Sequence, residues 1–182
     1  IRDRPIAIAA MLAATSLGAV WCSASPDFGP RGVLDRFGQI EPKLLITVDA
    51  YWYAGKKNPL GDRLAEIVAA LPSVGKVVVA DLCGDAATVA ANLPNGTTLE
   101  AYIAPFEAGE PTFERLPFDH PVYILFSSGT TGVPKCIVHR AGGVLLQHLK
   151  EHALHADVHA GDRLFYFTTL GWMMWNLSLI HI

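Results

Sequence analysis

A nine-residue stretch at positions 127–135, with the sequence SSGTTGVPK, has the residue types needed to hold a phosphate group. Gly129 and Gly132 permit positive φ angles, which lets neighbouring backbone N–H groups converge on one anion. Lys135 supplies a flexible positive charge that can follow a polyphosphate, and Pro134 stiffens the chain just before it. Small hydroxyl side chains add hydrogen-bond donors without blocking a ligand, at Ser127, Ser128, Thr130 and Thr131. The stretch therefore predicts a phosphate-binding loop, the alternative being an ordinary turn rich in small residues.

The segments on either side place this loop between two strands. Residues 122–126 (VYILF) predict a buried strand, and residues 136–139 (CIVH) predict a returning strand. The spacing of the loop differs from that of a Walker A motif, and the GxGxxG pattern of dinucleotide-binding folds is absent from the sequence. We assign no role to His139, at the end of the returning strand.

A second pattern, HLKEH at positions 148–152, matches the inverted zinc-protease motif HxxEH. His148 and His152 would bind zinc, and Glu151 would act as a base. Two further histidines, His155 and His159, follow at helical spacing. Histidines along one helix are collinear, so only adjacent pairs can share an ion and a distant third ligand is needed. A zinc-dependent hydrolase is kept as an alternative function.

The other interpretation of this segment is an amphipathic helix. Its apolar positions would face the core, and its histidines would face solvent or the acidic segment 81–119. The apolar positions are Val144, Leu145, Leu149 and Leu154. We favour this interpretation and assign no metal ligands, because short motifs often occur by chance.

Composition limits the function classes. The chain has 182 residues, of which 51% are hydrophobic and 17% charged, so it is too apolar for a disordered protein. The net charge of −3 argues against a nucleic-acid partner, which would usually meet a basic surface. Cys22, Cys83 and Cys136 lie far apart without a CxxC pair, which favours a reducing compartment over a disulfide scaffold.

The apolar run at residues 5–24 has two interpretations. Arg2 and Arg4 before it and small residues near Cys22 imitate a secretory signal, and its length is close to that of a membrane span. However, the run consists mainly of alanine and is interrupted by polar residues and glycine. We therefore expect a buried helix followed by a short core strand, and no membrane partner.

Predicted helices and strands alternate along the chain. Apolar strands are expected at 44–48 and 76–80, and amphipathic helices at 32–41 and 59–71. The acidic segment 81–119 is expected to be a solvated excursion with a short helix near 99–103. Apolar strands that alternate with helices are typical of an α/β fold in which helices flank a mixed, mostly parallel sheet.

The loop SSGTTGVPK resembles the phosphate-binding loop of the adenylate-forming enzymes, the superfamily of acyl-CoA synthetases, luciferases and peptide synthetases. Four other stretches narrow this likeness to the acetoacetate–CoA ligases of the superfamily: MLAATSLGAVW, SPDFG, GVLDRFGQIEPK and FTTLGWMMWN. The resemblance runs from about Ile8 to Asn176. It departs at Cys136, where the family most often has glycine, a position outside the phosphate contacts. The resemblance implies that residues 1–182 are part of the large N-terminal, AMP-binding domain.

The resemblance also implies a reaction that uses ATP, Mg²⁺ and CoA. Acetoacetate would be converted to an acyl-adenylate with release of pyrophosphate, and the acyl group would then pass to the CoA thiol. Preorganised hydrogen-bond donors and Mg²⁺ would stabilise the negative charge that develops on the leaving pyrophosphate. The resemblance implies catalytic roles for Lys135 and Thr130. Phosphate contacts are implied for Thr130, Thr131, Gly132 and Lys135, with Ser127, Ser128 and Gly129 shaping the loop.

Two other sites follow from the resemblance. Trp172, Met173 and Met174 match positions that line the acyl pocket, although such side chains are also ordinary core residues. Residues 25–36 match a loop near CoA. Lys56 falls where a basic residue meets the CoA nucleotide phosphates, although a solvated surface lysine is also expected there.

The family pattern sets further expectations for the chain as a whole. The adenine and ribose contacts and a small C-terminal domain with a catalytic lysine would lie beyond residue 182. The chain would then be an internal part of a longer cytoplasmic enzyme, inactive alone. Residues 177–182 do not continue the family pattern, and we place no site there. A ligase for acetate or propionate and a catalytically silent nucleotide-binding module stay open as alternatives.

Overall fold

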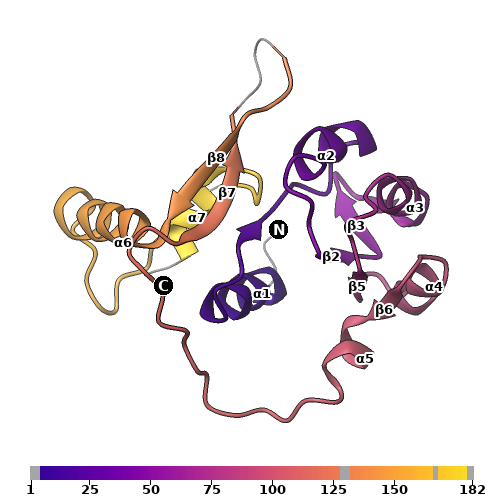
Figure 1. The fold of residues 1–182 in the computed structure, drawn as a ribbon, viewed down its shortest axis with the longest axis horizontal. Coiled ribbons are helices and arrows are strands. Elements are labelled where there is room, and N and C mark those ends of the chain that lie inside the picture. The colour runs from indigo at the N-terminus through magenta and orange to yellow at the C-terminus, as the bar shows by residue number, and fades with distance from the viewer. Residues whose placement is uncertain (1–4, 128–131, 166–167, 180–182) are drawn as a thin grey trace. The chain divides into compact units, whose positions relative to one another are not determined.

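The chain divides into two compact units, each with its own sheet (Figure 1). The computed structural model describes residues 5–127, 132–165 and 168–179. The first unit comprises residues 1–25 and 110–182, and the second comprises residues 26–109. The predicted α/β fold is confirmed, and in the described part of the chain the strands form two three-stranded sheets and a separate two-stranded hairpin.

The first unit is built on a mixed sheet with the strand order β1-β7-β8. β1 (Trp21–Cys22) runs parallel to β7 (Pro121–Phe126), although the two are distant in sequence. β7 runs antiparallel to β8 (Cys136–Arg140). Tyr123 and Leu125 of β7 are buried in the core of this unit. The predicted strand and its returning partner are thus confirmed.

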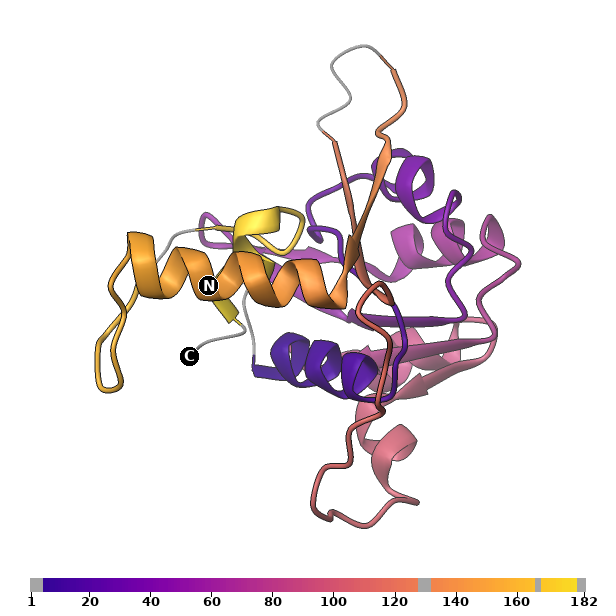
Figure 2. The ribbon, with the colours of Figure 1, turned by 60° about the vertical axis from the view of Figure 1, so that its left-hand side comes forward.

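Four helical segments belong to the described part of this unit: α1 (Pro5–Ser16), α6 (Ala141–Leu149), the π-helix η1 (Lys150–His155) and α7 (Met173–Leu179). The expected N-terminal helix and strand are confirmed as α1 and β1. The expected burial of the helix is wrong, because Met11 is its one buried residue and Leu12 is 48% exposed. Figure 2 shows α6 starting where β8 ends and continuing into η1 as one rod. No helix among the described residues combines the length and the apolar character needed to cross a membrane.

The start of α6 is fixed by the segment that precedes β7. The backbone N–H groups of Ala141 and Gly142 donate to the carbonyls of His120 (2.8 Å) and Phe118 (2.9 Å). A Cβ on Gly142 would clash with the ring of Phe118, so glycine lets this ring lie against the helix backbone. These contacts hold α6 directly beside the β7–β8 ladder.

The second unit is built on a parallel sheet with the strand order β2-β5-β6. β2 (Leu44–Val48) and β6 (Gly96–Thr98) flank the central strand β5 (Lys76–Ala80). The three central valines of β5 are completely buried, as a strand covered on both faces requires. β2 and β5 have the predicted bounds. β6 was not predicted, because its three residues carry no apolar run.

Four helices accompany this sheet: α2 (Pro30–Phe37), α3 (Gly61–Ala69), α4 (Ala86–Ala91) and α5 (Leu99–Ile103). A proline at the first position of α2 suits a helix start, because its φ is already helical and no N–H is needed there. The predicted helices α2, α3 and α5 are confirmed within a few residues. α4 was not predicted, since it lies in the segment 81–119 that was expected to be a solvated excursion. That expectation is wrong for residues 86–98, where α4 and β6 join the unit and Ala86, Ala90 and Leu93 are buried.

An antiparallel hairpin follows β2 directly, formed by β3 (Ala50–Tyr53) and β4 (Lys56–Pro59). Ala54 (φ 49°) and Gly55 (φ 75°) form its turn, and positive φ at both central residues is the requirement of a type I′ turn. The aromatic run before Ala54-Gly55 was the available sequence signal for this hairpin.

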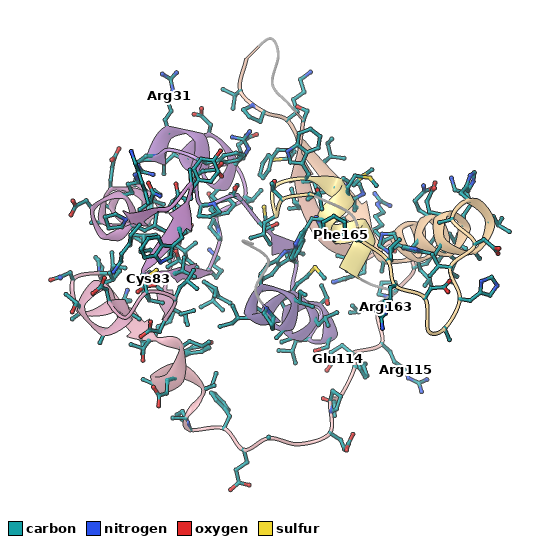
Figure 3. All side chains as sticks on the ribbon, turned by 180° about the vertical axis from the view of Figure 1, so that it is seen from behind. Arg31, Cys83, Glu114, Arg115, Arg163 and Phe165 are labelled. Atoms are coloured by element: carbon teal, nitrogen blue, oxygen red, sulfur yellow. The ribbon has the colours of Figure 1, made fainter. Side chains whose placement is uncertain are left out.

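The carboxylate of Asp49, at the end of β2, is almost completely buried, with 1% of the residue exposed. It accepts backbone N–H bonds from the loop that follows β5: from Leu82 (3.0 Å), Cys83 (3.0 and 3.2 Å) and Asp85 (2.8 Å). Figure 3 labels Cys83 in this loop. Burial acts to raise the pKa of Asp49, but these hydrogen bonds and one from Ala50 outweigh it and lower the pKa. The ionised carboxylate therefore ties together the chain ends that leave β2 and β5.

Replacing Asp49 with alanine is expected to lower the free energy of unfolding by about 2–4 kcal/mol, because several backbone N–H groups lose a charged acceptor. The pKa of Asp49 is lower in the folded than in the unfolded chain. Its contribution is therefore present above the unfolded value, about 4, and is lost as pH falls through the folded-state pKa. Urea unfolding followed by circular dichroism at neutral and acidic pH measures both effects.

Asp81→Ala is the matched control, since among the described residues this exposed carboxylate of the same loop accepts a bond only from the N–H of Gly84 (2.8 Å). We expect a clearly smaller loss for it. Equal losses for the two variants would contradict a special role for Asp49.

Candidate functional site

The predicted phosphate loop joins the ends of β7 and β8, where the regular ladder finishes at the pair Phe126–Cys136. Two hydrogen bonds extend this pairing by one residue on each strand, to Ser127 and Lys135. The N–H of Ser127 donates to the carbonyl of Lys135 (3.0 Å), and the N–H of Lys135 donates to the hydroxyl oxygen of Ser127 (3.0 Å). These two bonds close the neck of the loop.

The described residues of the loop have distinct environments. The side chain of Lys135 is exposed, whereas Pro134 before it is buried. Gly132 has a φ of 154°, which L side chains rarely adopt, and a Cβ there would meet no atom within 4 Å. The positive φ predicted for Gly132 is confirmed. The other predicted loop residues, Ser128, Gly129, Thr130 and Thr131, lie outside the described residues.

Tyr123 and His139 form a cross-strand pair in the ladder that carries this loop. Their ring centroids are 5.0 Å apart, and Tyr123 is only 2% exposed. Burial raises the pKa of Tyr123 to about 12 and lowers the pKa of His139. Both side chains are therefore uncharged at neutral pH, and the pair contributes packing to the ladder.

The residues expected to line an acyl pocket lie at the start of α7. Trp172 is 67% exposed and Met173 is 48% exposed, and Met174 is half-buried. The next two residues, Trp175 and Asn176, are buried (1% and 0% exposed). Sequence reasoning missed these two, although they complete the same GWMMWN stretch.

Lys56 belongs to the second unit, on β4 opposite Tyr53, and its side chain is exposed. In the part of the chain that the structure describes, Lys56 forms no ion pair. The neighbouring Lys57 donates to the carboxylate of Asp85 (2.6 Å) and to the carbonyl of Cys83 (3.2 Å). The hydrogen bond to Asp85 raises the pKa of Lys57 against the effect of burial. Of these two adjacent lysines, Lys57 is structural and Lys56 presents its charge to solvent.

The geometry of the HxxEH segment does not support a zinc site. His148 is buried in the last turn of α6, whereas Glu151 and His152 belong to η1. The carboxylate of Glu151 lies 3.0 Å from the ammonium of Lys150, accepts a bond from Gln147 (2.8 Å), and has its pKa lowered chiefly by Lys150. Over the described ranges, no three His, Cys, Asp or Glu side chains are grouped so that they could hold a metal ion.

The expected packing of this segment is wrong at three of the four apolar positions and at His148, and it is right for Val144 and for the exposed His155 and His159. Only Val144 of the four apolar positions is buried, and His148, expected toward solvent, is 1% exposed. Leu145, Leu149 and Leu154 are exposed instead, at 52%, 48% and 79%. α6 thus buries the i, i+4 pair formed by Val144 and His148. After Leu149 the π-helix changes the residues per turn, so an α-helical pattern no longer predicts the buried face.

Comparison with known proteins gives the family of the chain. The family model described as AMP-binding enzyme matches residues 1–180. This chain belongs to the AMP-binding enzyme family. The predicted membership in the adenylate-forming enzymes is thereby confirmed.

Individual members of the AMP-binding family are similar over nearly the whole chain. Acetoacetyl-coenzyme A synthetase of Rhizobium meliloti (strain 1021) is 58% identical over 174 residues, which cover 96% of this chain and 26% of that protein. Malonamoyl-CoA synthetase vrtB of Penicillium aethiopicum is 47% identical over 178 residues, which cover 93% of this chain and 24% of that protein. The solved structure of acetoacetyl-CoA synthetase from Streptomyces lividans matches with a TM-score of 0.87 and 46% identity, covering 97% of this chain and 26% of that one. The chain spans about a quarter of the length of these relatives.

If the loop holds phosphate as the sequence predicts, Gly132→Ala should weaken phosphate binding, because alanine tolerates the φ of 154° poorly. A Cβ there has open space, so the effect is backbone strain of about 1–3 kcal/mol rather than a clash. In the full-length protein, KM for ATP should then rise by roughly 5- to 150-fold, measured by ATP–pyrophosphate exchange.

Gly143→Ala provides the matched control on α6, where the glycine is exposed and a Cβ would also meet no atom within 4 Å. Because its backbone is helical, alanine should leave KM for ATP unchanged and slightly stabilise the helix. An unchanged KM in Gly132→Ala would show that the loop conformation does not matter for ATP.

Proposed function

We propose that this chain is part of an AMP-forming ligase that activates acetoacetate with ATP and transfers the acyl group to CoA. The observation that carries the proposal is the closed loop between β7 and β8, with its exposed lysine, in a chain 58% identical to an acetoacetyl-coenzyme A synthetase. The complete reaction is assigned to the full-length enzyme, because the relatives are about four times longer than the chain.

The first step forms acetoacetyl-AMP. A carboxylate oxygen of acetoacetate attacks the α-phosphorus of ATP, and the bond from that phosphorus to the bridging oxygen of the β-phosphate breaks. The electron pair of that bond leaves with pyrophosphate, so negative charge grows on the leaving group. Donors fixed in place before the reaction stabilise such charge at low reorganisation cost.

The loop residues would provide these donors. The hydrogen bonds between Ser127 and Lys135 hold the two ends of the loop together, and the ammonium of Lys135 is exposed. We assign the phosphate contacts to Lys135, Gly132, Thr130 and Thr131, and the shaping of the loop to Ser127, Ser128 and Gly129. Mg²⁺, when bound with ATP, would supply further positive charge at the phosphates.

The second step passes the acyl group to CoA. The CoA sulfur attacks the acyl carbon of acetoacetyl-AMP, AMP leaves, and the thiol proton is released. Lys56 is proposed to meet the CoA nucleotide phosphates, because its charge faces solvent while that of Lys57 is held by Asp85.

The identity of the acid is drawn from the acyl groups of the relatives. Acetoacetyl and malonamoyl groups both carry a carbonyl at C3, and enzymes named for both are similar to this chain. This favours acetoacetate over acetate and propionate, which have no such carbonyl. Trp172, Met173 and Met174 are proposed to line the acyl pocket, and the zinc hydrolase alternative is set aside on the geometry of residues 148–152.

The proposed setting is the cytoplasm, with small-molecule partners and neither nucleic acid nor membrane. None of the three cysteines, all within the described ranges, forms a disulfide. Unbridged cysteines are typical of a reducing compartment.

Lys135→Ala is expected to lower acetoacetate-dependent ATP–pyrophosphate exchange by about 100- to 1,000-fold in the full-length enzyme, as for loss of one transition-state donor. The exchange assay measures the first step alone and needs no CoA. Lys43→Ala, which removes an exposed lysine of the second unit, is the control and should leave exchange unchanged. Exchange that survives in Lys135→Ala at the control level would overturn the role of the loop lysine.

A further inference from the structure

Two adjacent residues of α7 have buried polar atoms that no described group satisfies. Trp175 is 1% exposed, and its indole Nε1 has no hydrogen-bond partner among the described residues. Asn176 is 0% exposed, and its Oδ1 has none, while its Nδ2 donates to the carbonyl of Trp172 at 3.3 Å. A buried donor without a partner is costly and rare, so a missing acceptor is expected near Trp175.

These atoms belong to the two residues that directly follow, in sequence, the proposed acyl-pocket residues Trp172, Met173 and Met174. Trp175 directly follows Met174, and the chain just before α7 is tied to the sheet because the hydroxyl of Ser23 donates to the carbonyl of Leu170. Ser23 follows β1, the strand that pairs with β7. Figures 1 and 2 both show α7 close to the β7–β8 ladder that carries the phosphate loop. The indole is therefore held in the same unit as that loop.

We propose that the indole N–H of Trp175 recognises the 3-oxo oxygen of the substrate acid, an inference that rests on the proposed function. The indole N–H only donates, and the C3 carbonyl of acetoacetate only accepts, so the two groups are complementary. Asn176 is not assigned to the acid, because its unsatisfied atom is an acceptor and acetoacetate offers it no donor. Trp175 would thus determine specificity for acids with a C3 carbonyl.

The assignment predicts discrimination against butyrate, which has the same carbon chain with CH₂ at C3. Butyrate would leave the buried N–H unpaired, and sites built to hydrogen-bond a substrate reject analogues that lack the bonding group. The wild-type full-length enzyme should therefore prefer acetoacetate over butyrate in kcat/KM by more than about 10-fold. Equal use of the two acids would overturn the assignment, whatever the behaviour of any variant.

Trp175→Phe tests the donor itself, because phenylalanine keeps an aromatic ring and removes the N–H. We expect kcat/KM for acetoacetate to fall about 10- to 100-fold and that for butyrate to stay within about 3-fold. The acetoacetate-to-butyrate ratio falls accordingly. A parallel fall for both acids would indicate a structural role and would overturn the assignment, as would an unchanged ratio.

Trp21→Phe is the matched control, because its indole Nε1 is also buried without a partner in the described structure. Trp21 packs against the core residues Tyr123, Leu125 and Val144. Removal of this N–H should leave the ratio between the two acids unchanged. A ratio lowered equally by both substitutions would overturn the assignment to Trp175. A wild-type enzyme without acetoacetate-dependent exchange would instead overturn the proposed function itself.

Discussion

The pair of hydrogen bonds between Ser127 and Lys135 is the constraint on which the candidate site depends. One bond joins two backbone groups, and the other recruits the Ser127 hydroxyl as acceptor for the Lys135 N–H. Together they extend the antiparallel β7–β8 pairing beyond Phe126 and Cys136. The lysine backbone is thus fixed while its ammonium is exposed, which is the arrangement that a preorganised phosphate contact needs. The buried ladder below, with Tyr123 and its partner His139, gives this neck a rigid support.

In the second unit, a buried carboxylate joins the chain segments that follow two parallel strands. Parallel strands cannot be joined by a tight turn, so the chain ends leaving β2 and β5 need another tie. The Asp49 carboxylate provides it by accepting N–H bonds from the loop after β5, and Lys57 adds an ion pair to Asp85 of that loop. This arrangement leaves Lys56 exposed on the hairpin, available to an anionic ligand.

Sequence patterns predicted the elements that local residue choice determines. β2, β5 and β7 are apolar runs bounded by polar residues, and the positive φ of Gly132 follows from the need for a tight backbone. Features set by tertiary contacts were not predictable in this way. β6 exists because β5 offers it a partner, and the burial of His148 follows from the face that α6 presents to its own unit. The buried polar atoms of Trp175 and Asn176 become visible only when burial and hydrogen bonds are known together.

The central claim is that the loop at residues 127–135 holds the phosphates of ATP. A crystal structure of the full-length enzyme with a non-hydrolysable ATP analogue tests it most directly. We expect β- and γ-phosphate oxygens at about 2.7–3.1 Å from the Lys135 ammonium and from backbone N–H groups of the loop. An analogue bound elsewhere, with no phosphate oxygen within hydrogen-bond distance of this loop, would contradict it.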